Sequence, residues 1–200
     1  LLNWIDSLTM DWPITRRRYY GTEVPIWYCK KCGTPHLPEP GRYYQPWKDK
    51  APFEKCSKCG STEFVGETRV FDTWFDSSIT LLYVCKYLRD KEFFEKAIKS
   101  IRIRPQGYEI VRTWLYFTTL RVYLLLGIPA FTHVRISGMG LDEKGEAMHK
   151  SKGNIIPPEP YLEKYGADAF RFWAAAAAKL GSDYRFSEQL LKTAILFFTK

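Results

Sequence analysis

The chain has 200 residues, of which 46% are hydrophobic, 16% aromatic and 26% charged, a globular composition that excludes disordered, collagenous and coiled-coil proteins. Its 30 Lys and Arg residues and 22 Asp and Glu residues give a net charge of +8. That charge fits a polyanionic partner such as RNA or a nucleotide, and it fits solubility alone equally well.

The first residues lack the pattern of a secretory signal, because neither a basic segment nor an apolar core is present. The chain does not begin with Met, so we expect it to be part of a longer one. Its most apolar stretch, 113–134, is interrupted by Arg121 and Gly127, which predicts a buried core helix and then a turn instead of a membrane span. We therefore expect an intracellular, cytoplasmic protein.

Hydrophobic spacing and turn residues predict the order of the elements after an amphipathic start. They are a strand at 24–28, a Pro-, Gly- and Cys-rich segment at 29–62, strands at 63–65 and 68–72, a helix at 78–99, a strand at 101–105, a helix at 109–126, a strand at 131–137, a Gly- and Lys-rich loop at 138–160, and helices at 158–180 and 187–199. The segment 29–62 has too little apolar periodicity to build a core of its own. The alternation over 63–137 predicts an α/β layer with parallel pairing.

Four of the five cysteines form two C-x2-C-G pairs, Cys29 with Cys32 and Cys56 with Cys59. The pairs are separated by 23 residues, slightly more than the roughly 15–20 usual for such sites. Four thiolates complete a tetrahedral structural zinc site, which leaves no open position for catalysis. Two disulfides are the alternative, which an intracellular location disfavours. The fifth cysteine, Cys85, lies in a helical pattern and is expected in the core.

A glycine-rich segment at 137–145 is similar in composition to a nucleotide-binding loop, but it matches neither the G-x-G-x-x-G motif nor the P-loop. Glu143 stands where a G-x-G-x-x-G motif needs its third glycine, and Glu146 stands where a P-loop needs its lysine. The residues that follow, 148–154, carry two lysines and a hydroxyl on a glycine-flanked loop. Such a loop can close over a triphosphate and neutralise charge on its phosphates. A solvated basic surface loop is the alternative.

Six segments resemble, in the same order, segments of the class I aminoacyl-tRNA synthetases. Met148-His149-Lys150-Ser151, followed by Gly153-Asn154, resembles the Lys-Met-Ser-Lys-Ser signature of that family. Two of the others, 12–16 and 21–27, resemble the re-entry into the catalytic domain after an editing insertion. The remaining three resemble an Asp-Thr-Trp-Phe segment (71–78), the ribose-binding segment (107–111) and the helix after the signature (165–171). Within the family, the archaeal-type valine enzymes are most similar and the isoleucine enzymes next.

The resemblance implies an α/β fold: the second half of a Rossmann-like catalytic domain with a zinc-knuckle insertion and C-terminal helices. It divides the chain into four parts. These are a re-entry segment at 1–28, a zinc-binding insertion at 29–62, a Rossmann-like half with the signature loop at 63–157, and a helical region similar to one that contacts the tRNA stem at 158–200.

The implied reaction converts valine and ATP to valyl-adenylate and pyrophosphate, and then transfers the valyl group to tRNA. ATP, valine and tRNA are thus the implied partners, Mg²⁺ is expected with ATP, and zinc is structural. The implied roles are pyrophosphate binding by Lys150 and Ser151, ribose binding by Gly107 and Glu109, further ATP contacts by Gly138, Met139 and Met148, and a valine pocket walled by Trp74, Ile110 and Trp114. Ile110 and Trp114 are four residues apart, so one helical face is expected to present both.

Two positions depart from the family pattern in ways that affect the chemistry. Ala147 stands where the first lysine of the signature belongs, so Lys150, with Lys152 or Lys144, would carry the phosphate contacts. Glu109 stands for the usual aspartate and offers a longer carboxylate for the same role.

The family's His-x-Gly-His segment is absent, since the histidines stand at 36, 133 and 149. We therefore expect this part of the catalytic domain to be inactive alone. Two alternatives remain: an isoleucine enzyme, and a non-catalytic zinc-ribbon module that binds RNA. Such a module would stack bases on Tyr19, Tyr20, Tyr43 and Tyr44.

Overall fold

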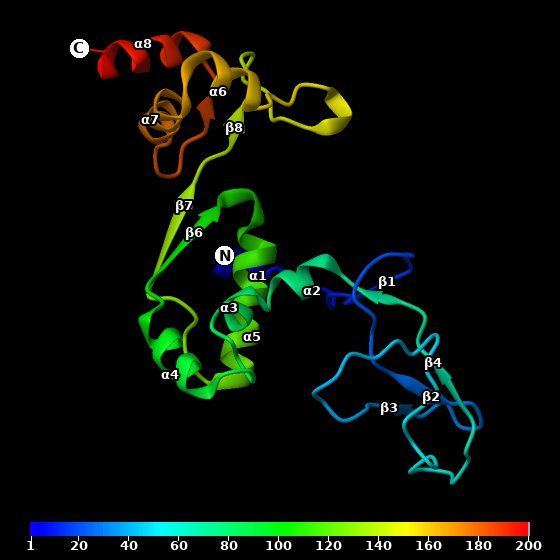
Figure 1. The fold of residues 1–200 in the computed structure, drawn as a ribbon. Coiled ribbons are helices and arrows are strands. Elements are labelled where there is room, and N and C mark those ends of the chain that lie inside the picture. The colour runs from blue at the N-terminus through cyan, green and yellow to red at the C-terminus, as the bar shows by residue number, and fades with distance from the viewer. Residues whose placement is uncertain (200) are drawn as a thin grey trace. The chain divides into compact units, whose positions relative to one another are not determined.

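The computed structural model describes residues 1–199 and shows two compact units, residues 1–89 and the residues from Asp90 onward (Figure 1). Each unit has its own sheets and its own buried residues. Among the described residues, no helix has the length and apolar character needed to cross a membrane. The division of the chain into four parts stays a prediction.

Short strands in two antiparallel sheets dominate the first unit. Its elements are α1 (Leu2–Asp6), β1 (Thr15–Arg16), β2 (Trp27–Cys29), β3 (Pro35–His36), β4 (Phe64–Gly66), β5 (Val70–Phe71), α2 (Thr73–Ser77) and α3 (Thr80–Val84). In one sheet β2 lies between β3 and β4, and in the other β1 pairs with β5. The strands predicted at 24–28, 63–65 and 68–72 are found as β2, β4 and β5.

One tryptophan organises the Pro- and Gly-rich segment of the first unit. Trp27 is 1% exposed, and the rings of Tyr44 and Phe53 meet it edge-on at 5.8 and 6.0 Å between centroids. At Gly66 a Cβ atom would lie 1.7 Å from the carbonyl oxygen of Pro46, so this close crossing requires glycine. The segment 29–62 thus lacks a periodic core, as expected, and packs on a side chain from the strand that precedes it.

A buried carboxylate fixes the turn between β4 and β5. Glu67 is 6% exposed, and its Oε1 accepts hydrogen bonds from the backbone N–H groups of Thr68 and Arg69 at 2.8 and 2.9 Å. Its Oε2 accepts from the Arg69 guanidinium and from the Tyr28 hydroxyl. The Arg69 guanidinium, with these backbone donors, lowers the pKa of Glu67 to about 2 despite burial.

We expect Glu67→Gln to destabilise the first unit in a pH-dependent way. Because the folded-state pKa is lowered from 4.5 to about 2, the carboxylate contributes its full stability above pH 4.5 and loses it as the pH falls toward 2. The variant should lose about 1–3 kcal/mol at neutral pH and match the wild type near pH 2. Urea unfolding across this range measures the difference. The exposed Glu63→Gln is the control, and a pH-independent Glu67→Gln deficit would contradict the account.

The helix predicted at 78–99 is wrong, because the chain breaks between two helices. α3 ends at Val84, and Lys86 and Leu88 then adopt left-handed φ angles of 59° and 62°, which end a helix. Asp90 starts α4 (Lys91–Ser100) by accepting the N–H of Phe93 at 3.0 Å through its side chain. The amphipathic spacing is continuous in sequence, but a second N-cap divides it.

The second unit contains a parallel strand pair joined through a helix. Its elements after α4 are β6 (Ile103–Gly107), α5 (Tyr116–Leu126), β7 (His133–Ser137), β8 (Gly140–Leu141), α6 (Glu159–Tyr165), α7 (Ala167–Ala177), β9 (Tyr184–Arg185) and α8 (Glu188–Phe198). β6 pairs in parallel with β7, and β8 with β9. The strands predicted at 101–105 and 131–137 and their parallel pairing are confirmed. The expected layer does not extend over 63–72, because β4 and β5 pair antiparallel in the first unit.

The helix predicted at 109–126 starts less regularly than its spacing suggests. A 3-10 turn at Tyr108–Ile110 leads into a π-helical turn at Val111–Leu115, and α5 follows. The helix ends at Gly127, whose φ of 67° is left-handed. The expectation of a buried core helix is only half right: Val122 is fully buried, whereas Leu124 is 73% exposed. One apolar face of α5 therefore remains open to solvent.

Three helices form the C-terminal part of the second unit around Trp173, Phe186 and Leu191. The helix predicted at 158–180 is divided at Gly166, where φ is 79° and ψ is 158°, values outside the helical region. The start of α8 is as predicted, because the Ser187 side chain accepts the N–H of Leu190. The predicted loop at 138–160 is irregular apart from β8, a short turn at Lys150–Lys152 and the start of α6 at Glu159.

Candidate functional site

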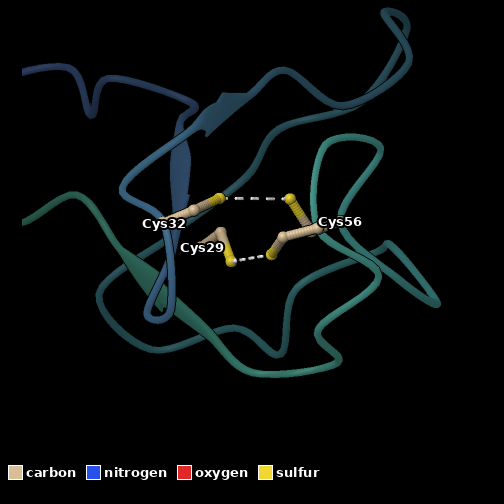
Figure 2. A group of neighbouring side chains, drawn as sticks. Cys29, Cys32 and Cys56 are labelled. Carbon is tan, nitrogen blue, oxygen red and sulfur yellow. Dashed lines mark hydrogen bonds between the residues drawn. The ribbon is translucent and has the colours of Figure 1, made fainter.

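The two cysteine pairs meet in the first unit, where Figure 2 shows Cys32 facing Cys56, with Cys29 beside them. The Sγ atoms of Cys29, Cys32, Cys56 and Cys59 all lie within 4.8 Å of one another, and all four thiols are free. The Sγ atoms of Cys29 and Cys59 are 3.5 Å apart, and those of Cys32 and Cys56 are 3.6 Å apart. A disulfide needs about 2.05 Å, whereas sulfurs around a tetrahedral zinc at about 2.3 Å lie about 3.8 Å apart. The structure thus favours the metal site over the disulfides.

The same local geometry holds both pairs. The glycine that follows each pair donates its N–H to the carbonyl of the first cysteine, Gly33 to Cys29 at 2.8 Å and Gly60 to Cys56 at 2.9 Å. Both glycines adopt left-handed φ angles, 70° and 71°. Each turn presents two thiols on one side, which is why C-x2-C-G spacing predicts a shared ligand set.

The protonation of the thiols also fits a cation. The Thr34 hydroxyl hydrogen-bonds to Cys32 Sγ at 3.1 Å and lowers the pKa of this thiol to about 6. At Cys59, the backbone N–H of Ser61 favours the thiolate, but burial and the neighbouring thiols outweigh it and raise the pKa to about 12. Clustered thiolates repel one another, and a divalent cation removes that repulsion. Four soft sulfur ligands fit zinc.

In the second unit, the carboxyl ends of β6 and β7 bring several predicted ATP-site residues together. Gly107 is in register with Ser137, whose hydroxyl donates to the carbonyl of Gln106 at 3.3 Å. Glu109 lies in the 3-10 turn just beyond β6, with an exposed side chain. A Cβ atom at Gly107 would lie 2.6 Å from Glu109 Oε1, so the carboxylate lies directly over the glycine. Ligands bind at this end of parallel strands in open α/β sheets.

The residues that follow β7, Gly138 and Met139, contact residues 182–184 of the same chain. A Cβ atom at Gly138 would lie 1.9 Å from the carbonyl oxygen of Ser182, so glycine permits this crossing. The backbone N–H of Met139 donates to Asp183 Oδ1 at 2.8 Å, and its carbonyl accepts from the N–H of Tyr184 at 3.0 Å. Both glycine and methionine therefore have structural partners, and their contact with adenine stays a prediction.

A buried aspartate, which the sequence analysis missed, organises the signature loop. Asp142 is 7% exposed, and its Oδ1 accepts the backbone N–H groups of Lys144 and Glu146 at 3.0 and 2.8 Å. Its Oδ2 accepts from Asn154 Nδ2 at 2.9 Å. These donors, led by the Glu146 N–H, lower the pKa of Asp142. The signal in the sequence is an aspartate three residues before Gly145, the pattern of a side-chain-capped turn.

Asn154 closes the other end of the loop. Besides its bond to Asp142, its Nδ2 donates to the carbonyl of Ala147 at 3.2 Å, and its Oδ1 accepts the N–H of His149 at 2.9 Å. Between these anchors, Lys150–Lys152 form a single 3-10 turn that ends at Gly153, whose φ is 67°. The hydrogen bonds of Asp142 and Asn154 therefore fix both ends of the loop that carries this turn.

The two lysines of the turn have different surroundings. Lys152 Nζ lies 3.5 Å from Glu146 Oε2, whereas none of the ion pairs among residues 1–199 includes Lys150. Lys150 and Ser151 are exposed, and Met148 is half-buried. Lys150 is thus the cation of this turn that is open to an added anion.

Asn154→Ala should release the loop without unfolding the unit. The change removes three hydrogen bonds at its base, of which each typically contributes about 1 kcal/mol. We therefore expect trypsin to cleave after Lys150 or Lys152 at least about tenfold faster than in wild type. Timed proteolysis with mass spectrometry measures this, with the exposed Asn3→Ala as control. Equal cleavage rates in Asn154→Ala and wild type would contradict the anchoring role.

The three predicted pocket residues are distributed over both units. Trp74 lies in the first turn of α2, in the first unit, and its N–H donates to Asp72 Oδ1 at 2.8 Å. Ile110 and Trp114 lie in the second unit, where Ile110 ends the 3-10 turn and Trp114 belongs to the π-helical turn. Both residues precede α5, and whether one helical face presents both stays a prediction. Their role as pocket walls stays a prediction.

The aromatic residues named for base stacking do not share one environment. Tyr19, Tyr20 and Tyr43 are 107%, 92% and 67% exposed, but Tyr44 is 9% exposed and packs edge-on against Trp27. Tyr44 therefore serves the core of the first unit, and the expectation that it stacks on bases is wrong. A second missed residue is His36, whose Nε2 lies 3.4 Å from Cys56 Sγ beside the cysteine cluster.

Comparison with known proteins gives consistent similarities. The chain is 59% identical over 202 residues to the valine–tRNA ligase of Aeropyrum pernix and 54% identical over 203 residues to that of Pyrobaculum aerophilum. Both alignments cover 100% of this chain but only 24% and 25% of those proteins, so the chain spans about a quarter of their length.

A solved structure and a family match agree with these relatives. LeuRS of Agrobacterium radiobacter, solved as a ternary complex with tRNA and LeuAMS, matches with a TM-score of 0.71 at 24% identity over 95% of this chain and 27% of that chain, which shows the fold. Residues 1–187 match the family described as tRNA synthetases class I (I, L, M and V). The chain therefore belongs to the class I tRNA synthetase family.

Proposed function

We propose that this chain is part of a valine–tRNA ligase, which activates valine with ATP as valyl-adenylate and transfers the valyl group to tRNA. The observation that carries the proposal is the identity of up to 59% to valine–tRNA ligases along the entire chain. The arrangement of Glu109 and Lys150 in the second unit supports it, because it supplies a carboxylate and a free ammonium group in one compact unit. A carboxylate can accept hydrogen bonds from the ribose hydroxyls of a nucleotide, and an ammonium group can bind its phosphates.

We assign β6, α5 and β7 to one half of a Rossmann-like domain, in which β6 and β7 belong to the sheet and α5 connects them. The parallel pairing of β6 with β7 and the helix between them support this assignment. The cysteine turns of the first unit are then a zinc-knuckle insertion, held together by the metal. Zinc at Cys29, Cys32, Cys56 and Cys59 is structural, because four thiolates fill its coordination sphere and leave no position for substrate.

The ribose of ATP would lie at the carboxyl end of β6. Glu109 accepts hydrogen bonds from its two hydroxyls, and Gly107 allows the sugar to approach the backbone closely. The position of the carboxylate over the glycine supports this pairing of roles. Gly138 and Met139 border the adenine through their chain atoms.

The signature loop would act on the phosphates. Lys150 supplies a positive charge to the leaving pyrophosphate, Ser151 adds a hydroxyl donor, and Met148 flanks the nucleotide. Mg²⁺ would arrive with ATP, because this ion keeps phosphate and water ligands. Little covalent chemistry falls to the protein, so positioning and charge stabilisation provide the rate.

Selection of valine would rest on an apolar pocket, to which the second unit would contribute Ile110 and Trp114. Such a pocket discriminates by only about 1–3 kcal/mol per methylene and rejects threonine poorly, because the hydroxyl has nearly the size of a methyl group. Isoleucine is excluded by volume. The proposal thus predicts misactivation of threonine at a measurable rate.

The test is aminoacylation of tRNA by the full-length protein. Valine should be attached to tRNA with a valine anticodon and not to isoleucine tRNA. Attachment of isoleucine to isoleucine tRNA would assign the protein to the isoleucine enzymes. Tight tRNA binding without any charging would favour a binding module.

A further inference from the structure

The second unit contains a buried cation with no acidic partner. Arg104 in β6 is 7% exposed, and none of the ion pairs among residues 1–199 includes it. Its Nε donates to Gln106 Oε1 at 3.3 Å, and its Nη2 has no hydrogen-bond partner in the described part of the chain. Burial lowers the pKa of this guanidinium, which is the direction for a cation without an anion beside it.

Aromatic rings take the place of a carboxylate around Arg104. The guanidinium carbon lies 3.7 Å from the centroid of the Trp114 ring and 5.2 Å from that of Phe131. Contacts at these distances are cation–π interactions, which are strongest with tryptophan and in desolvated sites. A buried unpaired charge is costly, and an apolar side chain of similar volume would avoid that cost. An arginine in this buried position therefore points to a role beyond packing.

Trp114 is the residue on which this cation acts most closely. It lies in the π-helical turn before α5, where the backbone departs from regular α-helix. π-helical turns often occur at functional sites. The Arg104 guanidinium lies over the Trp114 ring and packs against the indole on that side.

We propose that Arg104 is a positioning residue that fixes the indole of Trp114 and thereby sets the size of the amino-acid pocket. The inference rests on the proposed function, because it takes Trp114 as a wall of that pocket. Arg104 does not touch the substrate; it acts through the ring. Lysine cannot fully replace it, because an ammonium group lacks the flat face that stacks on an indole.

The experiment compares Arg104→Met, Arg104→Lys and the control Arg102→Met in the full-length protein. Arg102 is exposed just before β6, so its replacement removes a nearby positive charge without touching Trp114. In valine-dependent pyrophosphate exchange, Arg104→Met should raise the KM for valine about tenfold and change kcat and the KM for ATP less than about twofold. Discrimination of valine against threonine and isoleucine should fall in parallel. Arg104→Lys should recover part of the loss.

The results that would overturn this proposal differ from those that would overturn the proposed function. An unchanged valine KM and unchanged discrimination in folded Arg104→Met would overturn the proposal, as would equal losses in kcat and in both KM values, which indicate a general structural role. If Arg104→Met does not fold, Arg104→Lys decides by the same criteria, and failure of both to fold assigns Arg104 to stability alone. Failure of the proposed function looks different: the wild-type protein then shows no valine-dependent exchange at all.

Discussion

Cys56→Ser should abolish zinc binding and loosen the first unit, while the second unit keeps its structure. The four sulfurs lie within 4.8 Å of one another, and the segment 29–62 that carries them lacks a periodic apolar core. A structural zinc contributes on the order of 10–16 kcal/mol of apparent binding free energy. This is as large as the whole free energy of unfolding of a typical domain, about 5–15 kcal/mol. The zinc content should fall from about one equivalent to near zero, and amide exchange should speed up over residues 29–66.

The matched control is Cys85→Ala, which removes a thiol that is 1% exposed but lies outside the cluster. It should lower stability through the small cavity it creates and retain the full zinc content. Zinc analysis of wild-type protein purified without added metal provides the decisive baseline. Less than about half an equivalent in the wild type, or full zinc in Cys56→Ser, would contradict the metal site.

Lys150→Ala should slow valyl-adenylate formation by about 10²–10³-fold in the full-length protein and leave valine affinity nearly unchanged. The lysine stands on a turn whose base is anchored by Asp142 and Asn154, and it has no ion-pair partner among the described residues. Its charge would act on the phosphates as pyrophosphate leaves, so its loss raises the barrier more than it weakens binding. Single-turnover adenylate formation, followed with separate valine titrations, measures both effects.

Lys152→Ala is the control for that experiment, because Lys152 already interacts with Glu146 at 3.5 Å. We expect a loss of rate at least about tenfold smaller than for Lys150→Ala. The reverse order would transfer the main phosphate contact to Lys152. Normal rates in both variants would leave Lys144 as the remaining candidate.

The cysteine turns and the individual strands β6 and β7 could be predicted from sequence because their signals are local. A C-x2-C-G turn has one geometry wherever it occurs, so Cys29 and Cys56 could be recognised from spacing alone. The alternation around Ile103 and the terminator Gly127 likewise depend on neighbours in the chain. Such features need no knowledge of what packs against them.

What the sequence could not predict depends on contacts between distant residues. The helical spacing of 78–99 does not show that Lys86 and Leu88 take left-handed conformations, since neither is a residue type that favours them. Asp142 and Asn154 are 12 residues apart and each is an ordinary polar residue until the loop brings them together. Arg104 reads as an exposed charge in an alternating strand, yet that face of β6 is buried against aromatic rings.

The most direct test of the central claim is ATP–pyrophosphate exchange by the full-length protein with each of the 20 amino acids in turn. Exchange isolates the activation step, to which Glu109, Lys150 and the proposed pocket contribute, from later steps on tRNA. We expect the highest kcat/KM for valine, with threonine lower by about 10–200-fold, the range that an apolar pocket provides, and isoleucine lower still because its volume excludes it. A higher kcat/KM for isoleucine, leucine or methionine, or no exchange with any amino acid by folded, zinc-loaded protein, would contradict this expectation.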